Sequence, residues 1–196
     1  MKPYSDACDE NRDPILAVIR QEFSGCRTIL EIGSGTGQHA VYFARQLPQL
    51  TWQPSDIAGN HPGINAWRCE AGLDNLPEPL QLDVSRDDWP AAAYDGVFSA
   101  NTCHIMSWGE VKAMFRGIGQ VLVPGGVLCL YGPFNYHNSY TSDSNARFDA
   151  FLKSRDPASG IRNFEDLDSL AASNGMRHRQ DHEMPVNNRL LVWSRL

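Results

Sequence analysis

The stretch TILEIGSGTG, residues 28–37, joins a run of apolar residues to a turn that contains three glycines. Ile29, Leu30 and Ile32 make the run typical of a strand that is buried on both faces of a parallel sheet. After the last glycine, apolar residues recur at helical spacing, at Ala40, Phe43, Ala44 and Leu47. A buried strand, a glycine turn and an amphipathic helix in this order predict the first βα unit of an α/β fold.

The rest of the chain repeats this alternation of strand and helix patterns. Apolar or alternating segments predict strands at residues 50–56, 79–84, 94–100, 127–131, 176–183 and 189–196. Helices are expected to open at Asp13-Pro14, Pro62 and Asn163, and a further one to carry apolar residues from Trp108 to Leu122 along one side. Pro124-Gly125-Gly126 is expected to end the helix that carries Trp108. Residues 132–145 are expected to form a loop over a site, followed by a short helix that carries Phe148, Phe151 and Leu152. Seven strands with helices between the first five predict one α/β domain over residues 1–196.

The composition excludes several classes of protein. With 42% hydrophobic and 20% charged residues, the chain is expected to fold rather than stay disordered. Its formal net charge of -6 gives no positive field for a nucleic acid, which is therefore not expected as a partner. Apolar runs are too short to cross a membrane, and the first residues lack the apolar core of a signal peptide. The five cysteines form no C-x-x-C pair, which favours reduced thiols in a cytoplasmic protein.

The spacing of the glycines bears on which cofactor the turn would hold. Glycine turns after a first strand bind NAD, FAD or S-adenosylmethionine. A dinucleotide-binding turn needs G-x-G-x-x-G, whereas here the spacing is G-x-G-x-G and position 38 is Gln. Glu31 precedes the first glycine by two residues. The pattern E-x-G-x-G-x-G resembles motif I of the class I S-adenosylmethionine-dependent methyltransferases, which implies a cofactor site at Glu31, Gly33, Ser34, Gly35 and Gly37.

Two further acidic residues stand at expected strand ends. Asp56 ends the second strand, where a carboxylate can accept hydrogen bonds from two ribose hydroxyls. Asp83 ends the third strand and resembles, with Val84, the carboxylate and apolar residue that flank adenine in these methyltransferases. Because parallel strands end at one edge of a sheet, the three acids Glu31, Asp56 and Asp83 are expected to converge there on one cofactor beside the glycine turn, with Ile57 and Val84 as further contacts. Each aspartate could instead cap the following helix.

The resemblance covers nearly the whole chain. Its blocks are Asn11–Ile15, Gly35–Ala40, Trp52–Asp56, Leu82–Val84, Tyr131–Phe134 and Met184–Asn188. They look like those of a small family of methyltransferase-like proteins found in bacteria and animals. The resemblance implies a three-layer αβα sandwich around a mostly parallel seven-stranded sheet, with strand order 3-2-1-4-5-7-6 and strand seven antiparallel.

The acceptor side of the expected site carries fewer signals. Asn101 and His104 follow the fourth strand, where class I methyltransferases place residues that contact the methionine part of the cofactor or the acceptor. His104 could act as a general base, or it could only shape the pocket. Arg12 is a further catalytic candidate, since it could bind an anionic group. Residues 1–24 are expected to form a lid and helix, and residues 132–160 an insertion on the acceptor side. The candidate acceptor contacts are Tyr4, Arg12, His104, Phe134, Asn135 and Tyr136.

These patterns favour an S-adenosylmethionine-dependent methyltransferase that acts by in-line displacement on an O, N or S atom of a small molecule. A non-catalytic S-adenosylmethionine-binding module and an NAD(P)-dependent oxidoreductase are the alternatives, and a protein tail is a further conceivable acceptor. No metal site is predicted, because His178 and His182 lie four residues apart in an expected strand, too far to share one ion. A monomer or a homodimer is expected.

Overall fold

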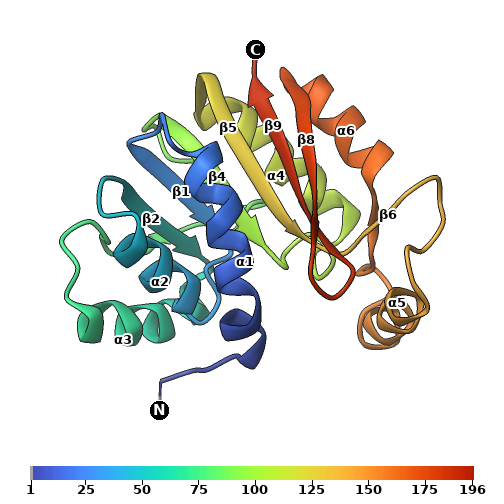
Figure 1. The fold of residues 1–196 in the computed structure, drawn as a ribbon, viewed down its shortest axis with the longest axis horizontal. Helices are drawn as coiled ribbons and strands as arrows, with labels where there is room; N and C mark the ends of the chain where they lie inside the picture. The colour runs from blue at the N-terminus through green and yellow to red at the C-terminus, as the bar shows by residue number, and fades with distance from the viewer. Residues whose placement is uncertain (1) are drawn as a thin grey trace.

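A seven-stranded sheet runs through the middle of the computed structural model, which describes residues 2–196 (Figure 1). Its strands are β1 (Thr28–Ile32), β2 (Thr51–Asp56), β3 (Leu80–Gln81), β4 (Tyr94–Ala100), β5 (Leu122–Gly132), β8 (Met176–Met184) and β9 (Asn188–Arg195). They lie in the order β3-β2-β1-β4-β5-β9-β8. Numbered within this sheet alone, that is the predicted order 3-2-1-4-5-7-6. β9 is antiparallel to both neighbours and the other pairs are parallel, so the predicted topology is confirmed.

Helices cover both faces of the sheet and make the expected three layers (Figure 1). One face packs against α1 (Asp6–Glu22), α2 (Gln38–Gln46) and α3 (His61–Ala71), and the other against α4 (Trp108–Val121) and α6 (Phe164–Ser173). The short helix η1 (Ala58–Asn60) joins β2 to α3, and α5 (Asp143–Arg155) lies to one side of the sheet. Side chains of β1 alternate between the two layers, with Ile29 in one apolar cluster and Leu30 in the other.

The first helix starts earlier than the sequence pattern predicts. α1 begins at Asp6, and Pro14 lies inside it rather than at its first position. Tertiary contacts hold the added turns, because the Ser5 N–H donates to Gln38 Oε1 (2.7 Å) and Gln38 Nε2 donates back to the Ser5 carbonyl (3.2 Å). Asp6 and Asp9 in the first turn also interact favourably with the helix dipole.

Other boundaries differ where local patterns compete with tertiary pairing. β5 begins at Leu122 and includes Pro124-Gly125-Gly126, which was expected to end the preceding helix and to lie before the strand. The pairing of β4 with β5 shifts register beside this irregular segment, between Tyr94 and Gly96. α5 begins at Asp143, inside a stretch expected to be a loop, because the Ser142 hydroxyl accepts from the Asn145 N–H (3.1 Å) and caps the helix. The short strands β6 (Phe134–Asn135) and β7 (Arg162–Asn163) form a second, two-stranded sheet.

The fold brings the carboxyl ends of β1, β2, β3 and β4 to one edge of the sheet. There the N–H groups of Gly33 and Ser34 both donate to the Ser55 carbonyl (3.0 Å each), which fixes the glycine turn to the end of β2. Among residues 2–196, no helix is long and apolar enough to cross a membrane. The divisions at residues 1–24 and 132–160 stay predictions.

Candidate functional site

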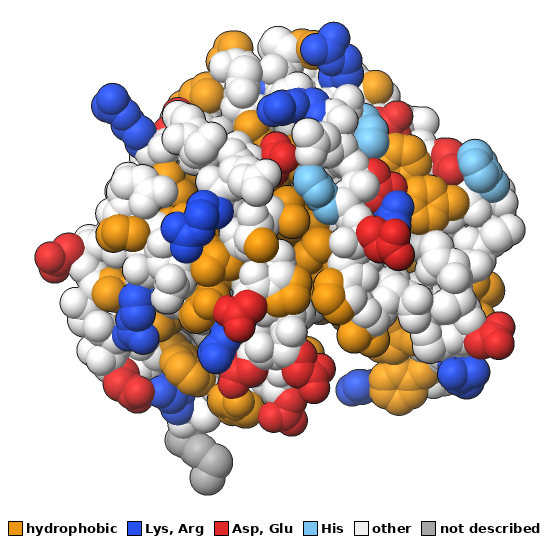
Figure 2. Space-filling model, viewed as in Figure 1, with side chains coloured by type: hydrophobic (Ala, Val, Ile, Leu, Met, Phe, Trp, Pro, Cys, Tyr) orange, Lys and Arg blue, Asp and Glu red, His pale blue; other side chains and the backbone are white. Residues whose placement is uncertain are grey.

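Two cavities open at this edge of the sheet and share four lining residues, Gly33, Gly35, Ala100 and Asn101. We call the first, of about 420 Å³, the Asp56 cavity; its other lining residues are Ile32, Asp56, Ile57, Asn60, Leu82, Asp83, Val84, Thr102, Ile105, Met106 and Glu110. The second, of about 570 Å³, we call the His104 cavity. Figure 2 shows the hollow at the lower edge of the molecule, between the start of α1 and the lobe that contains α5. Their shared lining makes the two cavities one crevice.

The three glycines of the turn have positive φ angles but different surroundings. A Cβ on Gly33 would lie 2.4 Å from a Thr102 methyl group, and one on Gly37 would lie 2.8 Å from the Ile64 Cα. These two glycines therefore permit close packing. A Cβ on Gly35 would meet nothing within 4 Å, and this residue lines both cavities. Gly35 is thus the glycine that leaves room for a ligand.

Glu31 lines neither cavity, although its position in the motif predicts a ligand contact. Its carboxylate is buried behind the turn, where it accepts hydrogen bonds from Ser34 Oγ (2.8 Å) and Trp52 Nε1 (3.2 Å). Burial raises the pKa of Glu31 to about 7, against the opposing effect of these two donors. Glu31 therefore supports the turn from behind, outside the cavity that Asp56 and Asp83 line, and its contact with a cofactor stays a prediction.

Asp56 and Asp83 both line the Asp56 cavity, as the strand pattern predicts. Asp56 Oδ2 accepts from the Gly35 N–H (2.7 Å), while Oδ1 accepts from the Ile57 N–H (2.7 Å) and Asn60 Nδ2 (2.9 Å). These bonds fix the carboxylate beside the glycine turn. Asp83 Oδ1 accepts from the N–H and the hydroxyl of Ser85 (3.1 and 2.9 Å), so it also holds the turn that follows it. Ile57 and Val84 add apolar surface to the same cavity.

Asn101 and His104 face one space at the end of β4. Asn101 adopts a left-handed backbone conformation with φ 59°, and its N–H donates to the Tyr131 carbonyl (2.9 Å). A Cβ on Gly132 would lie 3.9 Å from both Asn101 Oδ1 and His104 Nδ1, so both side chains border the space above this glycine. The His104 ring packs edge-on against Phe148, with ring centroids 5.2 Å apart.

The protonation of His104 follows from its surroundings. Burial, assisted by the positive charge of Arg162, lowers the pKa of His104 to about 4. Its imidazole is therefore neutral at pH 7 and has a nitrogen that can accept a proton. Arg162 itself is tied to the backbone, because its guanidinium donates to the carbonyls of Cys103, Met106 and Ala158.

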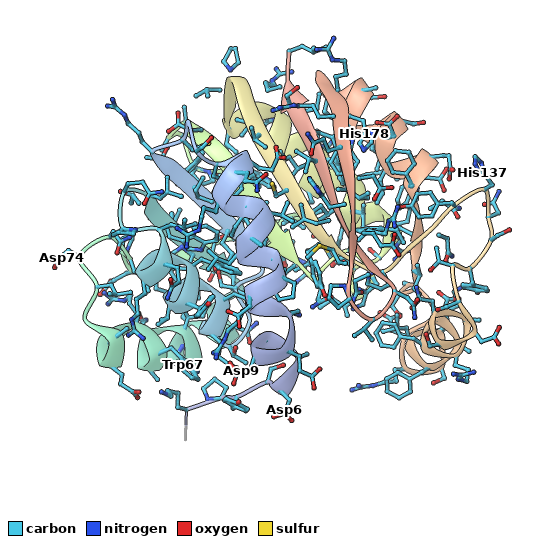
Figure 3. All side chains as sticks on the ribbon, viewed as in Figure 1. Asp6, Asp9, Trp67, Asp74, His137 and His178 are labelled. Atoms are coloured by element: carbon cyan, nitrogen blue, oxygen red, sulfur yellow. The ribbon has the colours of Figure 1, made fainter. Side chains whose placement is uncertain are left out.

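Two of the predicted acceptor contacts, Arg12 and Tyr4, line neither cavity. Figure 3 labels Asp9 and Trp67, the residues that they contact near the start of the chain. Arg12 forms an ion pair with Asp9 and lies 4.8 Å from the centre of the Tyr42 ring. The Tyr4 hydroxyl also donates to Asp9, and its ring stacks on Trp67. Contacts with Asp9, Tyr42 and Trp67 hold these two side chains outside the cavity linings. The roles of Arg12 and Tyr4 toward an acceptor stay predictions.

The predicted contacts from the 132–160 segment also point elsewhere. Phe134 is fully buried in the apolar core, and Asn135 pairs with Asn163 in the small β6–β7 sheet. The Tyr136 hydroxyl donates to Asp181 Oδ2 (2.6 Å) on β8. None of the three lines either cavity. The pairing of β6 with β7 holds Phe134 and Asn135 away from the cavities. The segment lines the His104 cavity with Pro133, Ser144, Asn145 and Phe148 instead.

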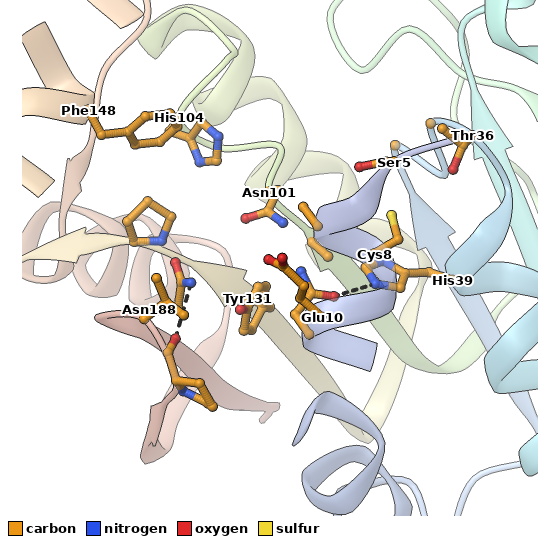
Figure 4. A pocket seen from close by; sticks show the side chains of 18 of the residues that line it. Ser5, Cys8, Glu10, Thr36, His39, Asn101, His104, Tyr131, Phe148 and Asn188 are labelled. Atoms are coloured by element: carbon orange, nitrogen blue, oxygen red, sulfur yellow. Dashed lines mark hydrogen bonds between the residues drawn. The ribbon is translucent and has the colours of Figure 1, made fainter. Parts of the chain in front are cut away.

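The wall of the His104 cavity comes from residues that pattern analysis did not select (Figure 4). They come from the start of α1, from α2, β5 and α5, and from the turn between β8 and β9. These residues are Ser5, Cys8, Glu10, Asn11, His39, Tyr131, Ser144, Asn145, Phe148, Pro185, Val186 and Asn188. One interaction ties two of these elements together, since His39 Nε2 lies 2.7 Å from Asn11 Oδ1. Asn11, His39 and residues 185–188 all lie in the sequence blocks that carry the family resemblance. That resemblance was the one sequence feature that could have indicated them as site residues.

Metal-ligating side chains do not gather in the part of the chain that the structure describes. Within residues 2–196, no group of three or more His, Cys, Asp or Glu side chains could hold a metal ion. His182 Nε2 lies 3.5 Å from Glu22 Oε1 on α1, and the His178 ring packs against Phe164 and Trp193. These two histidines thus belong to separate contacts of β8.

Comparisons with known proteins agree with this fold. The model of the family described as "Protein of unknown function (DUF938)" matches residues 2–195. A fatty-acid O-methyltransferase of Mycolicibacterium smegmatis is 29% identical over 100 residues, which are 51% of this chain and 35% of that protein.

Solved structures extend the likeness over most of the chain. An O-methyltransferase family protein from Burkholderia thailandensis has a TM-score of 0.82 and 17% identity over 93% of this chain. The S-adenosylmethionine-dependent methyltransferase SibL has a TM-score of 0.81 and 23% identity over 96%. NcsB1 from neocarzinostatin biosynthesis, solved with S-adenosylmethionine and a naphthoic acid, has a TM-score of 0.80 and 16% identity over 97%. The chain spans 55% of the length of each. At these identities the likeness shows a shared methyltransferase fold.

Proposed function

The chain belongs to the family described as "Protein of unknown function (DUF938)", and from its fold and crevice we propose that it is an S-adenosylmethionine-dependent methyltransferase with a small-molecule acceptor. The observation that carries the proposal is the continuity of the crevice. A cavity edged by Asp56, Asp83 and the glycine turn opens, across Asn101, into a second cavity that holds a neutral histidine. This arrangement suits a cofactor in one cavity that presents its reactive group to a substrate in the other.

The residues present fit S-adenosylmethionine. The open space beside Gly35 would admit the methionine part of the cofactor against the turn. Asp56 Oδ2 accepts one hydrogen bond and has a lone pair left for a ribose hydroxyl. Ile57 and Val84 offer apolar surface for an adenine ring, beside the Asp83 carboxylate. When bound, the cofactor supplies a methyl group on a sulfonium sulfur, which is an electrophile.

The chain's own residues would position the acceptor and accept its proton. Asn101, held in its left-handed conformation, stands between the two cavities and would fix the relative position of the two ligands. His104, neutral at pH 7, would accept a proton at a ring nitrogen from a hydroxyl, thiol or ammonium acceptor. The His104 side chain is buried, which limits the access of water to its ring nitrogen. The relatives named as O-methyltransferases support methyl transfer to a small molecule.

Calorimetric titration with S-adenosylhomocysteine tests the cofactor assignment, with NADH as the competing ligand. S-adenosylhomocysteine is expected to bind, and NADH is not, because the turn lacks the third glycine of a dinucleotide site. Asp56→Ala should weaken S-adenosylhomocysteine binding by about 2–3 kcal/mol through lost charge-assisted hydrogen bonds. Asp56→Asn keeps one acceptor oxygen and should lose less. Asp74→Ala, at an exposed loop position, is the matched control. Tight NADH binding without S-adenosylhomocysteine binding would overturn the assignment.

Turnover separates an enzyme from a non-catalytic binding module. The wild-type protein with S-adenosylmethionine and fractionated cell metabolites is expected to release S-adenosylhomocysteine. Because the pKa of His104 is about 4, turnover should stay constant from pH 8 to pH 6 and fall as the pH approaches 4. His104→Ala should slow turnover far more than it weakens S-adenosylhomocysteine binding. Cofactor binding with no product from any fraction would favour the binding module.

A further inference from the structure

The His104 cavity has an unusual balance of charge. Of the residues that line it, Glu10 is the one with a charged side chain, because burial keeps His39 and His104 neutral by lowering the pKa of each to about 4. No Lys or Arg among residues 2–196 lines this cavity. In Figure 4 the Glu10 side chain lies between those of Asn101, Tyr131 and His39. The cavity therefore has a negative group and no positive one.

Nothing in the described part of the chain neutralises Glu10. No ion pair within residues 2–196 involves its carboxylate. Arg12, two residues away on α1, is paired with Asp9 instead. Arg162, behind His104, donates to three backbone carbonyls and does not line the cavity. The negative potential of Glu10 is thus free to act on a molecule in the cavity.

Two of the amide side chains that line the cavity, Asn145 and Asn188, use their N–H groups within the protein. Asn145 Nδ2 donates both of its hydrogens, one to Thr141 Oγ1 (2.9 Å) and one to the Asn187 carbonyl (3.1 Å). Asn188 Nδ2 donates to the Pro185 carbonyl (3.3 Å). The carbonyl oxygens of both amides accept no hydrogen bond within residues 2–196. These oxygens can accept hydrogen bonds from a ligand, whereas Asn11 and Asn101 of the same wall keep amide nitrogens that can donate, so the charge of Glu10 and not the amides sets the preference for an ammonium group.

Part of the rim of the cavity is apolar. Phe148 and Val186 line it and are 36% and 79% exposed. A ligand that reaches from the Glu10 carboxylate to this rim would need a polar, positively charged end and an apolar body.

Resting on the proposed function, we propose that the methyl acceptor is a small molecule with an ammonium group and an apolar body, and that Glu10 selects it against carboxylates. A fatty acid, the substrate class in the name of the curated relative, is an anion at neutral pH and is disfavoured here. Glu10 is then a specificity-determining residue of the acceptor cavity.

Two sets of matched probes test this inference on the protein saturated with S-adenosylhomocysteine. One set is tyramine, 4-ethylphenol and 4-hydroxyphenylacetate; the other is hexylamine, hexanol and hexanoate. Binding of each is measured by ligand-observed NMR at up to 10 mM. The ammonium member of each set should bind at least about 5-fold tighter than the carboxylate member, since Glu10 is exposed and partly screened by water.

Variants then locate the effect at Glu10. Glu10→Gln should bring the ammonium and carboxylate affinities within about 2-fold of each other, and Glu10→Lys should reverse their order. Asp6→Asn removes the same charge one turn earlier on α1, from a residue that does not line the cavity. This control should leave the ratio near its wild-type value, which separates a local contact from the net charge of the protein.

Each failure has its own meaning. If the wild-type protein does not bind S-adenosylhomocysteine, the proposed function fails first. If it binds S-adenosylhomocysteine but the carboxylates bind as well as the amines, or no amine binds at 10 mM, the acceptor inference is wrong and the proposed function stands. If Glu10→Gln changes only the S-adenosylhomocysteine affinity, Glu10 contacts the cofactor's ammonium group, which also overturns the acceptor assignment.

Discussion

The Asp56 cavity and the His104 cavity meet at Asn101 but are built by opposite means. The first is formed by turns that directly follow β1, β2, β3 and β4, and backbone N–H groups hold its key carboxylate. The second is assembled from the start of α1, from α5 and from the turn between β8 and β9, which lie far apart in the sequence. One half of the crevice is thus a local property of the sheet, whereas the other depends on how distant segments pack.

Because of this difference, substitutions in the two halves should affect different quantities, stability and cofactor affinity in one and acceptor affinity in the other. Changes in the glycine turn act on the fold and on the cofactor site together, because the turn is packed from both sides. Changes in the acceptor wall fall on side chains such as Phe148 that contribute less to the core. We therefore expect substitutions around the Asp56 cavity to lower stability or cofactor affinity. Substitutions in the wall of the His104 cavity should change acceptor binding alone.

Gly37→Ala should give the largest loss of stability. An alanine at φ 89° is strained, and its Cβ would lie 2.8 Å from the Ile64 Cα of α3, so α2 and α3 must move apart. The free energy of unfolding should fall by about 3–5 kcal/mol. Gly72→Ala is the control, because Gly72 has φ 58° and open space around its Cβ position, and it should cost about 1 kcal/mol. Urea denaturation of both variants measures the two values; equal losses would contradict the packing role of Gly37.

Glu31→Gln should change the pH dependence of stability. The folded-state pKa of Glu31, about 7, lies above its ordinary value of 4.5, so its contribution to stability is present below pH 4.5 and is lost as the pH rises through 7. Glutamine has no such loss. Between pH 5 and pH 8 the variant should therefore gain up to about 3 kcal/mol relative to the wild type. The free energy of unfolding of both proteins is measured at each pH, and the titration of His39 and His104 drops out of the difference because both proteins contain them. A difference that does not change with pH would contradict a raised pKa of Glu31.

Gly35→Ala should damage binding much more than the fold. Its φ of 57° matches that of Gly72, and a Cβ at either position meets no atom within 4 Å, so both variants should lose similar, small amounts of stability. Only the Cβ at residue 35 would enter the crevice. We expect S-adenosylhomocysteine affinity to fall at least about 30-fold, or about 2 kcal/mol, in Gly35→Ala and to stay unchanged in Gly72→Ala. Calorimetry on both variants decides; intact binding in Gly35→Ala would place the cofactor elsewhere.

Phe148→Ala should have the smallest effect on stability. It should weaken acceptor binding in the His104 cavity without changing cofactor binding. The side chain is 36% exposed and packs on the His104 ring, so its loss should cost under about 1 kcal/mol of stability. S-adenosylhomocysteine affinity should not change, while binding of hexylamine should weaken several-fold through lost apolar contact. Phe151→Ala, more exposed on the same helix and absent from the cavity lining, is the control. A changed cofactor affinity in Phe148→Ala would show that the two halves are coupled.

The same contrast explains what the sequence could predict. The order of the sheet and the placement of Asp56, Asp83 and the glycine turn follow from patterns within a few residues of each strand end. The inward direction of Glu31 does not, because only its contact with Trp52 on the neighbouring strand shows which face it occupies.

The acceptor wall depended on tertiary contacts that local patterns do not encode. The added turns of α1 rest on the hydrogen bonds between Ser5 and Gln38, two segments more than thirty residues apart. Phe134 and Tyr136 looked like loop residues over a site, yet strand pairing with β7 and contact with Asp181 drew them inward. The side chains that took their place, Asn145 and Phe148, belong to a helix whose start depends on the Ser142 cap.

The position of Ser5 in the wall of the crevice has a practical consequence for handling the protein. Before Ser5 the chain runs along α3, where Lys2 pairs with Glu70 and the Pro3 carbonyl accepts from Trp67 Nε1, so a purification tag ahead of residue 2 would extend from the α3 side of the crevice. The last residue, Leu196, is exposed at the opposite end of the molecule (Figure 1). Immobilisation through that end would leave the entrance open to screening compounds.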